Sequence, residues 1–187
     1  MSERKRAKTE RAILHAAKVL YEKQGVDGVT FDEIAKAADV CRTTVFNHYA
    51  SADDLQSALA SAEVDDLLAH CRESGRSGLA LVETLLEKLI DDTVRYPRVM
   101  ARLTNEAVLG RVGVRVAEIE RLIADQYEAE YGPFPPDAEP TAELLSQMTL
   151  GLYFGQVNHL LAHGLPFEAE SMRCDMRAML RCLLKTD

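Results

Sequence analysis

The chain has 187 residues, of which 47% are hydrophobic and 28% are charged, and it contains no tryptophan. This is the composition of an ordinary globular protein that is long enough to form a core of its own. No stretch approaches the roughly 18 uninterrupted apolar residues of a membrane helix. His15 and Lys18 interrupt the only candidate for a signal segment. These features argue against a membrane as a partner and predict a cytoplasmic location.

The net charge of −8 is unevenly distributed along the chain. Residues 1–56 contain nine basic and nine acidic side chains, so the whole acidic excess belongs to the remainder. Five of those nine basic side chains lie in the first eleven residues, where we expect a flexible cationic arm suited to phosphate contacts. The alternative is that this basic segment serves solubility alone.

The cysteines and histidines predict neither a disulfide framework nor a metal site. The four cysteines are scattered without a Cys-x-x-Cys pair: Cys41, Cys71, Cys174 and Cys182. Such cysteines are typical of free thiols, with redox sensing as the alternative. His159 and His163 have a spacing that suits zinc, but no third ligand accompanies them. We therefore expect no metal and no cofactor.

The N-terminal segment predicts a first helix over about Thr9–Gln24, followed by two short helices joined by a tight turn. Thr30 and Glu33 have the spacing of a capping box, which starts the second helix. That helix ends near Asp39, since aspartate tolerates left-handed backbone better than most residues. The third helix runs from about Arg42 to Tyr49.

The third helix has an inward and an outward side. Val45 and Tyr49 are expected to pack inward, because a helix of two turns is not stable without neighbours. The side chains that remain outward are Arg42, Thr43, Thr44, Phe46, Asn47 and His48. This pattern predicts a helix-turn-helix whose second helix enters the major groove of DNA.

The remainder of the chain predicts six further helices and no strand. Their expected ranges are about 52–72, 79–95, 98–109, 114–131, 141–163 and 167–185. Four prolines in the loop Gly132–Pro140 prevent a continuous helix there. The predicted fold is all-α, with an N-terminal three-helix helix-turn-helix domain, residues 1–52, and a six-helix C-terminal domain, residues 53–187.

The last two predicted helices carry more apolar surface than one core requires. Two adjacent antiparallel helices of this kind predict a four-helix interface between two copies of the chain. The residues that we expect there are Gly151, Leu152, Gly155, Leu160, Met172, Met176, Met179 and Leu183. A thick monomeric core is the alternative.

The order of these features resembles the TetR (tetracycline-repressor-like) family of transcriptional regulators. The matching residues lie in about the first 55: Thr30-x-x-x-Ile-Ala35, Ala38-Asp-Val40, Thr44-Val-Phe-x-His-Tyr49 and Asp54-Leu55. The remaining residues match in length and helix layout only. The resemblance implies a helix-turn-helix over about 32–51 that binds a double-stranded DNA operator, and a C-terminal domain that dimerises and binds a small molecule.

Residue roles follow from the same resemblance. Phe46 matches a position that contacts the DNA backbone or a thymine methyl, and His48 matches a phosphate contact. Asn47 can pair with adenine and Arg42 with guanine, each through two hydrogen bonds. The full set of expected DNA contacts is Thr30, Arg42, Thr43, Thr44, Phe46, Asn47, His48, Tyr49 and Lys8.

The chain departs from the family pattern at three positions. Cys41 stands where serine or threonine often caps the recognition helix, and Asp39 replaces the usual glycine of the turn. Ala52 stands where a lysine commonly contacts phosphate, so the salt dependence of DNA binding is expected to be shallower by about one unit.

The effector site is the least specified part of the sequence. The candidate ligand-binding residues are polar side chains on apolar helices: Asn105, Gln147, Tyr153, Gln156, Asn158 and His159. For each of them, a hydrogen-bonded place in the core or in an interface is the alternative.

The function that we expect is a homodimeric regulator, most simply a repressor that a small-molecule inducer releases from a palindromic operator. Two rival classes remain. An enzyme would need a phosphate loop, a nucleophile elbow or a His-Glu-x-x-His motif, and none occurs, so no catalytic residue is assigned. A helical adaptor that binds only protein is the other, and the basic N-terminal segment argues against it.

Overall fold

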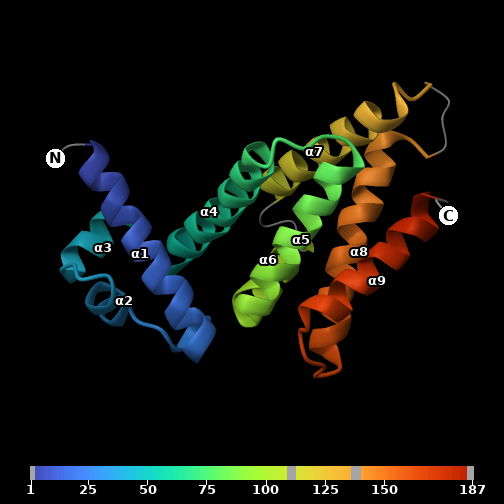
Figure 1. Cartoon of the computed structure of the whole chain (residues 1–187). Helices are drawn as coiled ribbons and strands as arrows, with labels where there is room; N and C mark the ends of the chain where they lie inside the picture. The colour runs from blue at the N-terminus through green and yellow to red at the C-terminus, as the bar shows by residue number, and fades with distance from the viewer. Residues whose placement is uncertain (1–2, 109–112, 136–139, 185–187) are drawn as a thin grey trace. The chain divides into compact units, whose positions relative to one another are not determined.

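The computed structural model describes residues 3–108, 113–135 and 140–184, and every regular element among them is a helix (Figure 1). The elements are α1 (Glu3–Gln24), the 3₁₀ turn η1 (Val26–Gly28), α2 (Phe31–Ala37), α3 (Arg42–His48), α4 (Ala52–Glu73), α5 (Leu79–Arg95), α6 (Pro97–Val108), α7 (Gly113–Tyr131), α8 (Ala142–Ala162) and α9 (Ala169–Leu184). The all-α prediction is confirmed. Within the described ranges, no helix is long and apolar enough to cross a membrane.

The largest difference from the predicted helices is at the N-terminus, where α1 begins at Glu3 and not at Thr9. The Thr9 hydroxyl donates to the Lys5 carbonyl at 3.0 Å, as a threonine inside a helix does. Residues 3–8 are strong helix formers with no glycine or proline to stop them. The expectation of a flexible arm is therefore wrong for these residues, whose basic side chains are carried by a helix.

Other boundaries differ by a few residues. Pro97 is the first residue of α6 rather than a residue before it, because proline fits the first turn of a helix. Thr141 caps α8 by accepting from the Leu144 amide at 3.2 Å, and α9 begins at Ala169 rather than at Phe167. The predicted helix end at Leu109, the end at Lys185, and parts of the loops 110–113 and 132–140 lie outside the described residues.

The chain divides into two compact units, residues 1–63 and 64–187, and α4 contributes to both. The first unit has a small core, in which four branched aliphatic side chains are completely buried: Ile13, Ile34, Val45 and Leu55. A half-buried ion pair joins Lys18 of α1 to Glu63 at the end of this unit, at 2.6 Å. The short helices α2 and α3 depend on this core, since neither is long enough to be stable alone.

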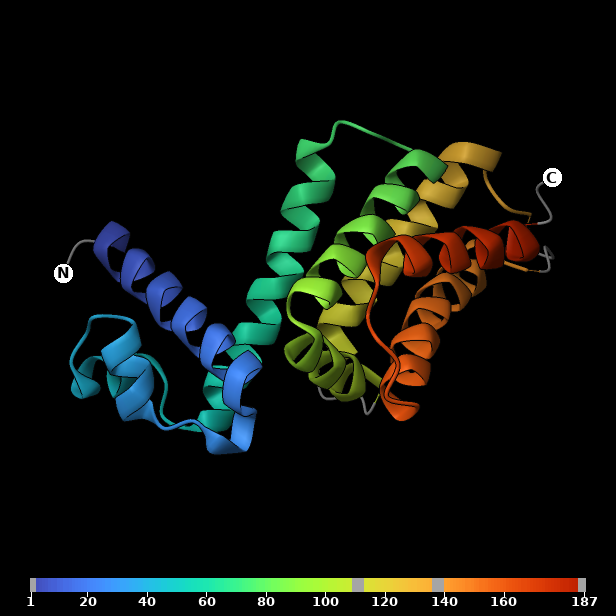
Figure 2. The ribbon, with the colours of Figure 1, turned by 60° about the horizontal axis from the view of Figure 1, so that its bottom comes forward.

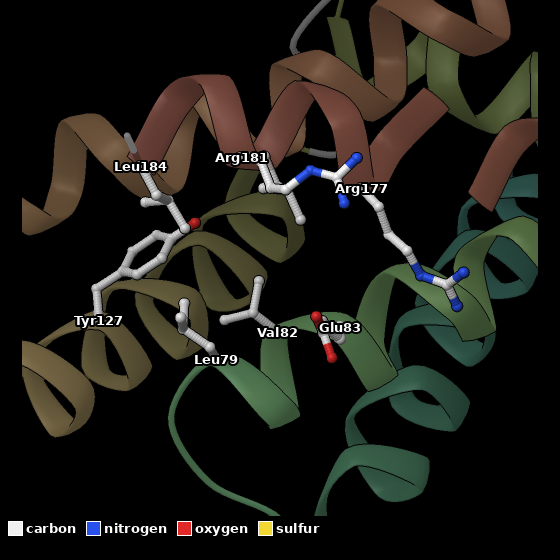
Figure 3. Close-up of a pocket in the computed structure, with 8 residues that line it drawn as sticks. Leu79, Val82, Glu83, Tyr127, Arg177, Arg181 and Leu184 are labelled. Atoms are coloured by element: carbon white, nitrogen blue, oxygen red, sulfur yellow. The ribbon is translucent and has the colours of Figure 1, made fainter. Parts of the chain in front are cut away.

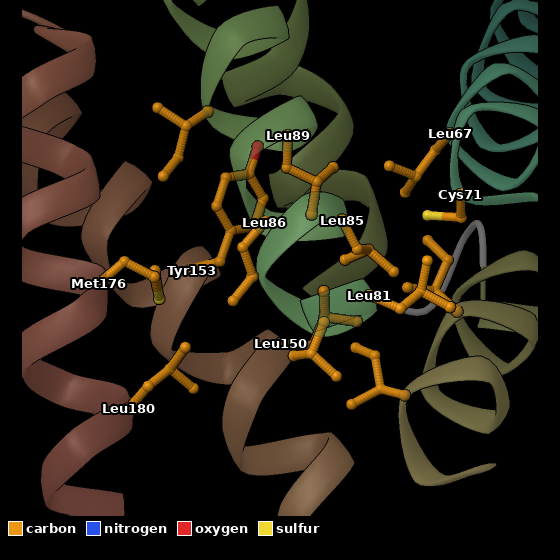
Figure 4. Close-up of a cluster of buried hydrophobic side chains, with 14 of the residues drawn as sticks. Leu67, Cys71, Leu81, Leu85, Leu86, Leu89, Leu150, Tyr153, Met176 and Leu180 are labelled. Carbon is orange, nitrogen blue, oxygen red and sulfur yellow. The ribbon is translucent and has the colours of Figure 1, made fainter. Parts of the chain in front are cut away.

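The second unit contains α5 to α9 and the last part of α4 (Figure 2), with one continuous hydrophobic core (Figure 4). Tyr153 lies in this core, and its hydroxyl is 2.7 Å from that of Thr93. Thr93 gives its own hydrogen to the Leu89 carbonyl, so Tyr153 is the donor of the pair. Burial raises the pKa of Tyr153 to about 12. The same arrangement recurs where Tyr127 donates to Thr149 at 2.5 Å.

Side chains of α7 cap the N-terminus of α5. The amide of Gly78 donates to the Gln126 side chain at 3.0 Å, and the amide of Leu79 donates to Glu130 Oε2 at 3.1 Å. Gly78 has a φ of 61°, and a Cβ added there would lie 2.2 Å from Glu130 Oε2. Glycine at position 78 therefore permits both the backbone conformation and the cap.

We expect Gly78→Ala to destabilise the protein by about 2 kcal/mol, from left-handed strain and the displaced cap together. Gly75→Ala is the matched control, because Gly75 has a φ of 64° and a Cβ there would meet nothing within 4 Å. Urea unfolding of both variants separates the cost of the left-handed backbone strain from the cost of losing the Glu130 cap. An equal loss of unfolding free energy in the two would show that Glu130 contributes nothing.

Candidate nucleic-acid interface

The N-terminus of α2 has the local chemistry that its sequence predicts. The Thr30 amide donates to Glu33 Oε2 at 2.8 Å, and the Glu33 amide donates to Thr30 Oγ1 at 3.3 Å. This reciprocal capping box also lowers the pKa of Glu33, first through the bond to the Thr30 backbone. The hydroxyl of Thr30 is exposed but already bonded to Glu33, so any phosphate contact there is shared with the cap.

Asp39 forms the turn itself, with a φ of 54°. The amide of Val40 donates to the Ala35 carbonyl at 3.0 Å, and the Asp39 amide donates to the Lys36 carbonyl at 3.3 Å. These two bonds form a Schellman motif, whose left-handed position usually holds glycine. Asp39 occupies that position because aspartate accepts left-handed backbone at moderate cost.

The outward face of α3 is available to a partner. Arg42, Thr43, Phe46 and Asn47 are exposed, and Thr44 and His48 are half-buried. Phe46 is 44% exposed, which is unusual for an aromatic side chain with no ligand. Four residues that the sequence predicted as DNA contacts thus share one accessible surface on a helix of seven residues.

Two residues of α2 contact this face, and neither contact is predicted by the sequence. Asp32 forms an ion pair with Arg42 at 3.2 Å, and the Phe31 ring lies 4.9 Å from the Phe46 ring, measured between centroids. The Arg42 guanidinium lies 5.3 Å from the Phe46 centroid. The contacts made by Asp32 and Phe31 join positions ten and fifteen apart in sequence, and no spacing rule for a single helix reveals them.

Tyr49 is part of the core rather than of the exposed face. It is 5% exposed, and its buried hydroxyl has no hydrogen-bond partner. Burial, with a smaller contribution from the Glu10 carboxylate, raises the pKa of Tyr49 to about 12. Its role in the structure is to support α3 from beneath.

We expect Tyr49→Phe to stabilise the protein by about 1 kcal/mol, because it removes an unsatisfied buried hydroxyl without changing the ring. Its DNA affinity should equal that of the wild type. Thermal unfolding and a fluorescence-anisotropy titration with labelled DNA measure the two quantities. A loss of DNA affinity in this variant would instead assign the hydroxyl to a DNA contact.

Cys41 is the N-cap residue of α3 and is exposed. Its Sγ lies 2.9 Å from Thr44 Oγ1, and this hydroxyl, followed by the Thr44 amide, holds the pKa of the Cys41 thiol below its usual value. Cys71 is the opposite case, because burial raises the pKa of its thiol.

The two thiols are therefore expected to react differently with iodoacetamide, since the thiolate is the reactive form. Cys41 should be alkylated faster than Cys71 at pH 7.5, and bound DNA should protect it. Cys174 is the control for nonspecific shielding, because it is an exposed thiol of the second unit. Mass spectrometry of peptides after timed labelling measures each rate. Equal labelling of Cys41 with and without DNA would place it outside the interface.

The basic side chains of α1 form a second exposed surface. Arg4, Lys8, Arg11 and His15 are spaced by four, three and four residues, so they lie along one face of the helix, and all four are exposed. Lys8 is the member predicted as a DNA contact. A row of basic side chains on a helix suits a phosphate backbone, and it takes the place of the flexible arm that was expected.

The six candidate effector residues do not share one environment. Tyr153 is buried and bonded to Thr93, whereas Gln147 and His159 are exposed on α8. Asn105 and Asn158 are half-buried. Gln156 Nε2 lies 3.3 Å from both the Met172 carbonyl and Asp175, and its buried Oε1 has no partner. Among the described residues, no group of three or more possible metal ligands is present.

The predicted interface residues divide into two groups. Met172 and Met176 are 1% and 2% exposed and belong to the core of their own chain. Gly151 and Gly155 are exposed, and the remaining four are partly buried: Leu152, Leu160, Met179 and Leu183. An apolar groove of about 430 Å³ lies along the outer side of α8 and α9, lined by Met148, Leu152, Ala178, Met179, Cys182 and Leu183.

Comparison with known proteins agrees with this geometry. Residues 13–59 match the family of bacterial regulatory proteins described as the tetR family. No curated protein sequence matches the chain.

Solved structures match over nearly the whole chain. A transcriptional regulator from Rhodococcus sp. RHA1 is 18% identical with a TM-score of 0.74, covering 94% of this chain and 96% of its own. A TetR-family regulator from Streptomyces coelicolor is 19% identical with a TM-score of 0.70, covering 100% of this chain and 85% of its own. A structure described as the molecular basis for control of antibiotic production by bacterial hormones is 17% identical with a TM-score of 0.70, covering 99% and 98%.

At these identities the structures establish the fold, and the helix-turn-helix match establishes the kind of N-terminal domain. The chain therefore resembles the TetR family of bacterial regulatory proteins, by sequence in its helix-turn-helix and by fold along almost its whole length.

Proposed function

We propose that the protein is a homodimeric, sequence-specific DNA-binding transcriptional regulator, most simply a repressor released from a palindromic operator by a small molecule. The observation that carries the proposal is the exposed face of α3, where Arg42 and Asn47 stand beside Phe46 on a capped helix-turn-helix. Arginine and asparagine are the side chains best suited to guanine and adenine edges in the major groove. The basic row on α1 adds contacts to phosphate that carry no sequence information.

Self-association is supported by the outer face of α8. Leu144 and Met148 are exposed there, and the groove that Met148 lines is apolar. A Cβ at Gly151 or Gly155 would meet nothing within 4 Å in the same chain. Glycine inside a helix is less stable than alanine by about 1 kcal/mol, so these two glycines are better explained by close approach of a second copy.

A two-fold dimer presents two copies of α3 to DNA and favours a palindrome, with half-sites roughly 34–36 Å apart or a multiple of that distance. α4 belongs to both compact units, so a ligand that changes α4 in the second unit can change the separation of the two recognition helices. The ligand acts through its different affinity for the two states. One structural neighbour is described as the molecular basis for control of antibiotic production by bacterial hormones, and this description supports the proposal of an effector.

Selection of DNA from a random pool by the purified full-length protein tests the proposal. The expected product is an inverted repeat whose binding requires both halves. A protein-only adaptor would enrich no sequence, and a nonspecific DNA-binding protein would retain DNA without a consensus. Either result contradicts the proposed function.

A further inference from the structure

An incomplete ladder of ion pairs joins α5 and α9 on the surface of the second unit. α5 carries carboxylates at Glu83, Glu87 and Asp91, and α9 carries arginines at Arg173, Arg177 and Arg181, each set spaced by four residues. Side chains four apart lie on one face of a helix. Arg173 pairs with Asp91, and Arg177 pairs with Glu87 at 3.2 Å.

The third pair of the ladder is not formed. Glu83 and Arg181 are both exposed, and neither has an ion-pair or hydrogen-bond partner among the described residues. The space at this position is larger than beside the closed pairs. Between the closed pairs the hollow measures about 20 Å³, whereas the pocket at Glu83 and Arg181 measures about 160 Å³.

The floor of the larger pocket is apolar and its rim is charged (Figure 3). Leu79 and Val82 of α5, the Tyr127 ring of α7, and Leu180 and Leu184 of α9 form the floor. At the rim, Arg177 and Arg181 reach from α9, and Glu83 stands on α5. The lining therefore carries two cations and one anion, and one of the cations is unpaired.

We propose that this pocket binds a small amphiphilic carboxylate, whose charged group pairs with Arg181 and whose apolar body covers the partly exposed Leu79 and Leu184, above the buried Val82 and Tyr127. In the two closed pairs, an arginine of α9 forms an ion pair with a carboxylate of α5. At the third position, the carboxylate of the ligand forms the ion pair with Arg181 in place of Glu83. The planar guanidinium suits a carboxylate through two parallel hydrogen bonds. Glu83 is the competing partner, since it is the carboxylate that would otherwise close the ladder.

The site is separate from the six effector candidates of the proposed function and does not depend on DNA binding. Its test therefore reads ligand binding directly, and its failure would leave the DNA-binding proposal unchanged.

Octanoate is a suitable probe, with octylamine and octanol as analogues of the same chain length. Titration of the ¹⁵N-labelled full chain, followed by amide NMR shifts, should show saturable octanoate binding with a Kd of about 1 mM or tighter. The shifts should concentrate in residues 79–83 and 177–184. Octylamine and octanol should bind at least about tenfold more weakly, because neither supplies a negatively charged carboxylate that pairs with arginine through two hydrogen bonds.

Two substitutions at the rim should act in opposite directions. Arg181→Gln should weaken octanoate binding about tenfold or more, because it removes the cation. Glu83→Gln should tighten it about two- to fivefold, because it removes the competing carboxylate. Arg173→Gln is the matched control: it breaks a closed pair on the same helix but does not line the pocket, and octanoate affinity should not change.

The proposal fails if octanoate does not saturate, if the shifts map elsewhere, or if octylamine binds equally well. It also fails if Arg173→Gln weakens binding as much as Arg181→Gln, since the effect would then be a general loosening of α9. Melting temperatures of all three variants establish that each is folded at the temperature of the titration.

Discussion

Replacing Asn47 with alanine is expected to remove sequence-specific DNA binding while leaving nonspecific binding intact. An asparagine that pairs with adenine through two hydrogen bonds contributes about 1–3 kcal/mol of discrimination. A dimer makes the contact in both half-sites, so the loss is about 2–6 kcal/mol for the selected operator. The salt dependence of binding should stay the same, because asparagine carries no charge and releases no counterion.

The measurement is fluorescence anisotropy with the selected operator and with a scrambled sequence, each at several salt concentrations. Gln24→Ala is the matched control, because Gln24 is an exposed amide of the same unit that lies outside the α3 face. Unlike Asn47→Ala, Arg42→Ala should lower the affinity for both the operator and the scrambled DNA, and it should reduce the salt dependence of binding. If Asn47→Ala binds the two sequences with the same preference as the wild type, Asn47 does not read a base.

The prediction rests on a face that is only partly readable from sequence. The capping box at Thr30 and the turn at Asp39 were predictable because each depends on residues within a few positions along the chain. The burial of Val45 was predictable because a helix of two turns is not stable without neighbours to pack against. The pairing of Arg42 with Asp32 was not predictable, because it depends on how α2 packs against α3.

The predictions of helix ends and of buried helix faces were wrong for different reasons. The predicted start of the first helix at about Thr9 is wrong, because residues 3–8 contain no signal that stops a helix and the Thr9 hydroxyl donates back to the Lys5 carbonyl inside α1. Met172 and Met176 were assigned to the interface because α9 is apolar on more than one side. Periodicity finds apolar faces, but it does not say which one the chain itself covers. In α9 the chain covers the face with Met172 and Met176.

In α8, the chain itself leaves the side that carries Met148 exposed. A charge placed on this side is expected to have a large effect on self-association. Met148→Glu is expected to convert the proposed dimer to a monomer. Met148 is 44% exposed and lines the apolar groove of the same unit, so it contributes little to the core of its own chain. A two-fold interface brings in two copies of every substitution, here two carboxylates removed from water. Each buried unpaired charge costs several kcal/mol, so the dimer dissociation constant should rise by about a thousandfold or more.

Analytical ultracentrifugation across a range of concentrations measures this change, and circular dichroism should show unaltered helix content. Ala80→Glu is the matched control, because it adds the same charge at an exposed position of α5 in the same unit. The monomeric variant should lose affinity for the full inverted repeat but bind an isolated half-site as weakly as the wild type does, because each recognition helix is intact. A Met148→Glu protein that remains a dimer with wild-type operator affinity would place the interface on another surface. Dissociation with full operator affinity would show that one copy of α3 suffices, which no palindrome-reading mechanism allows.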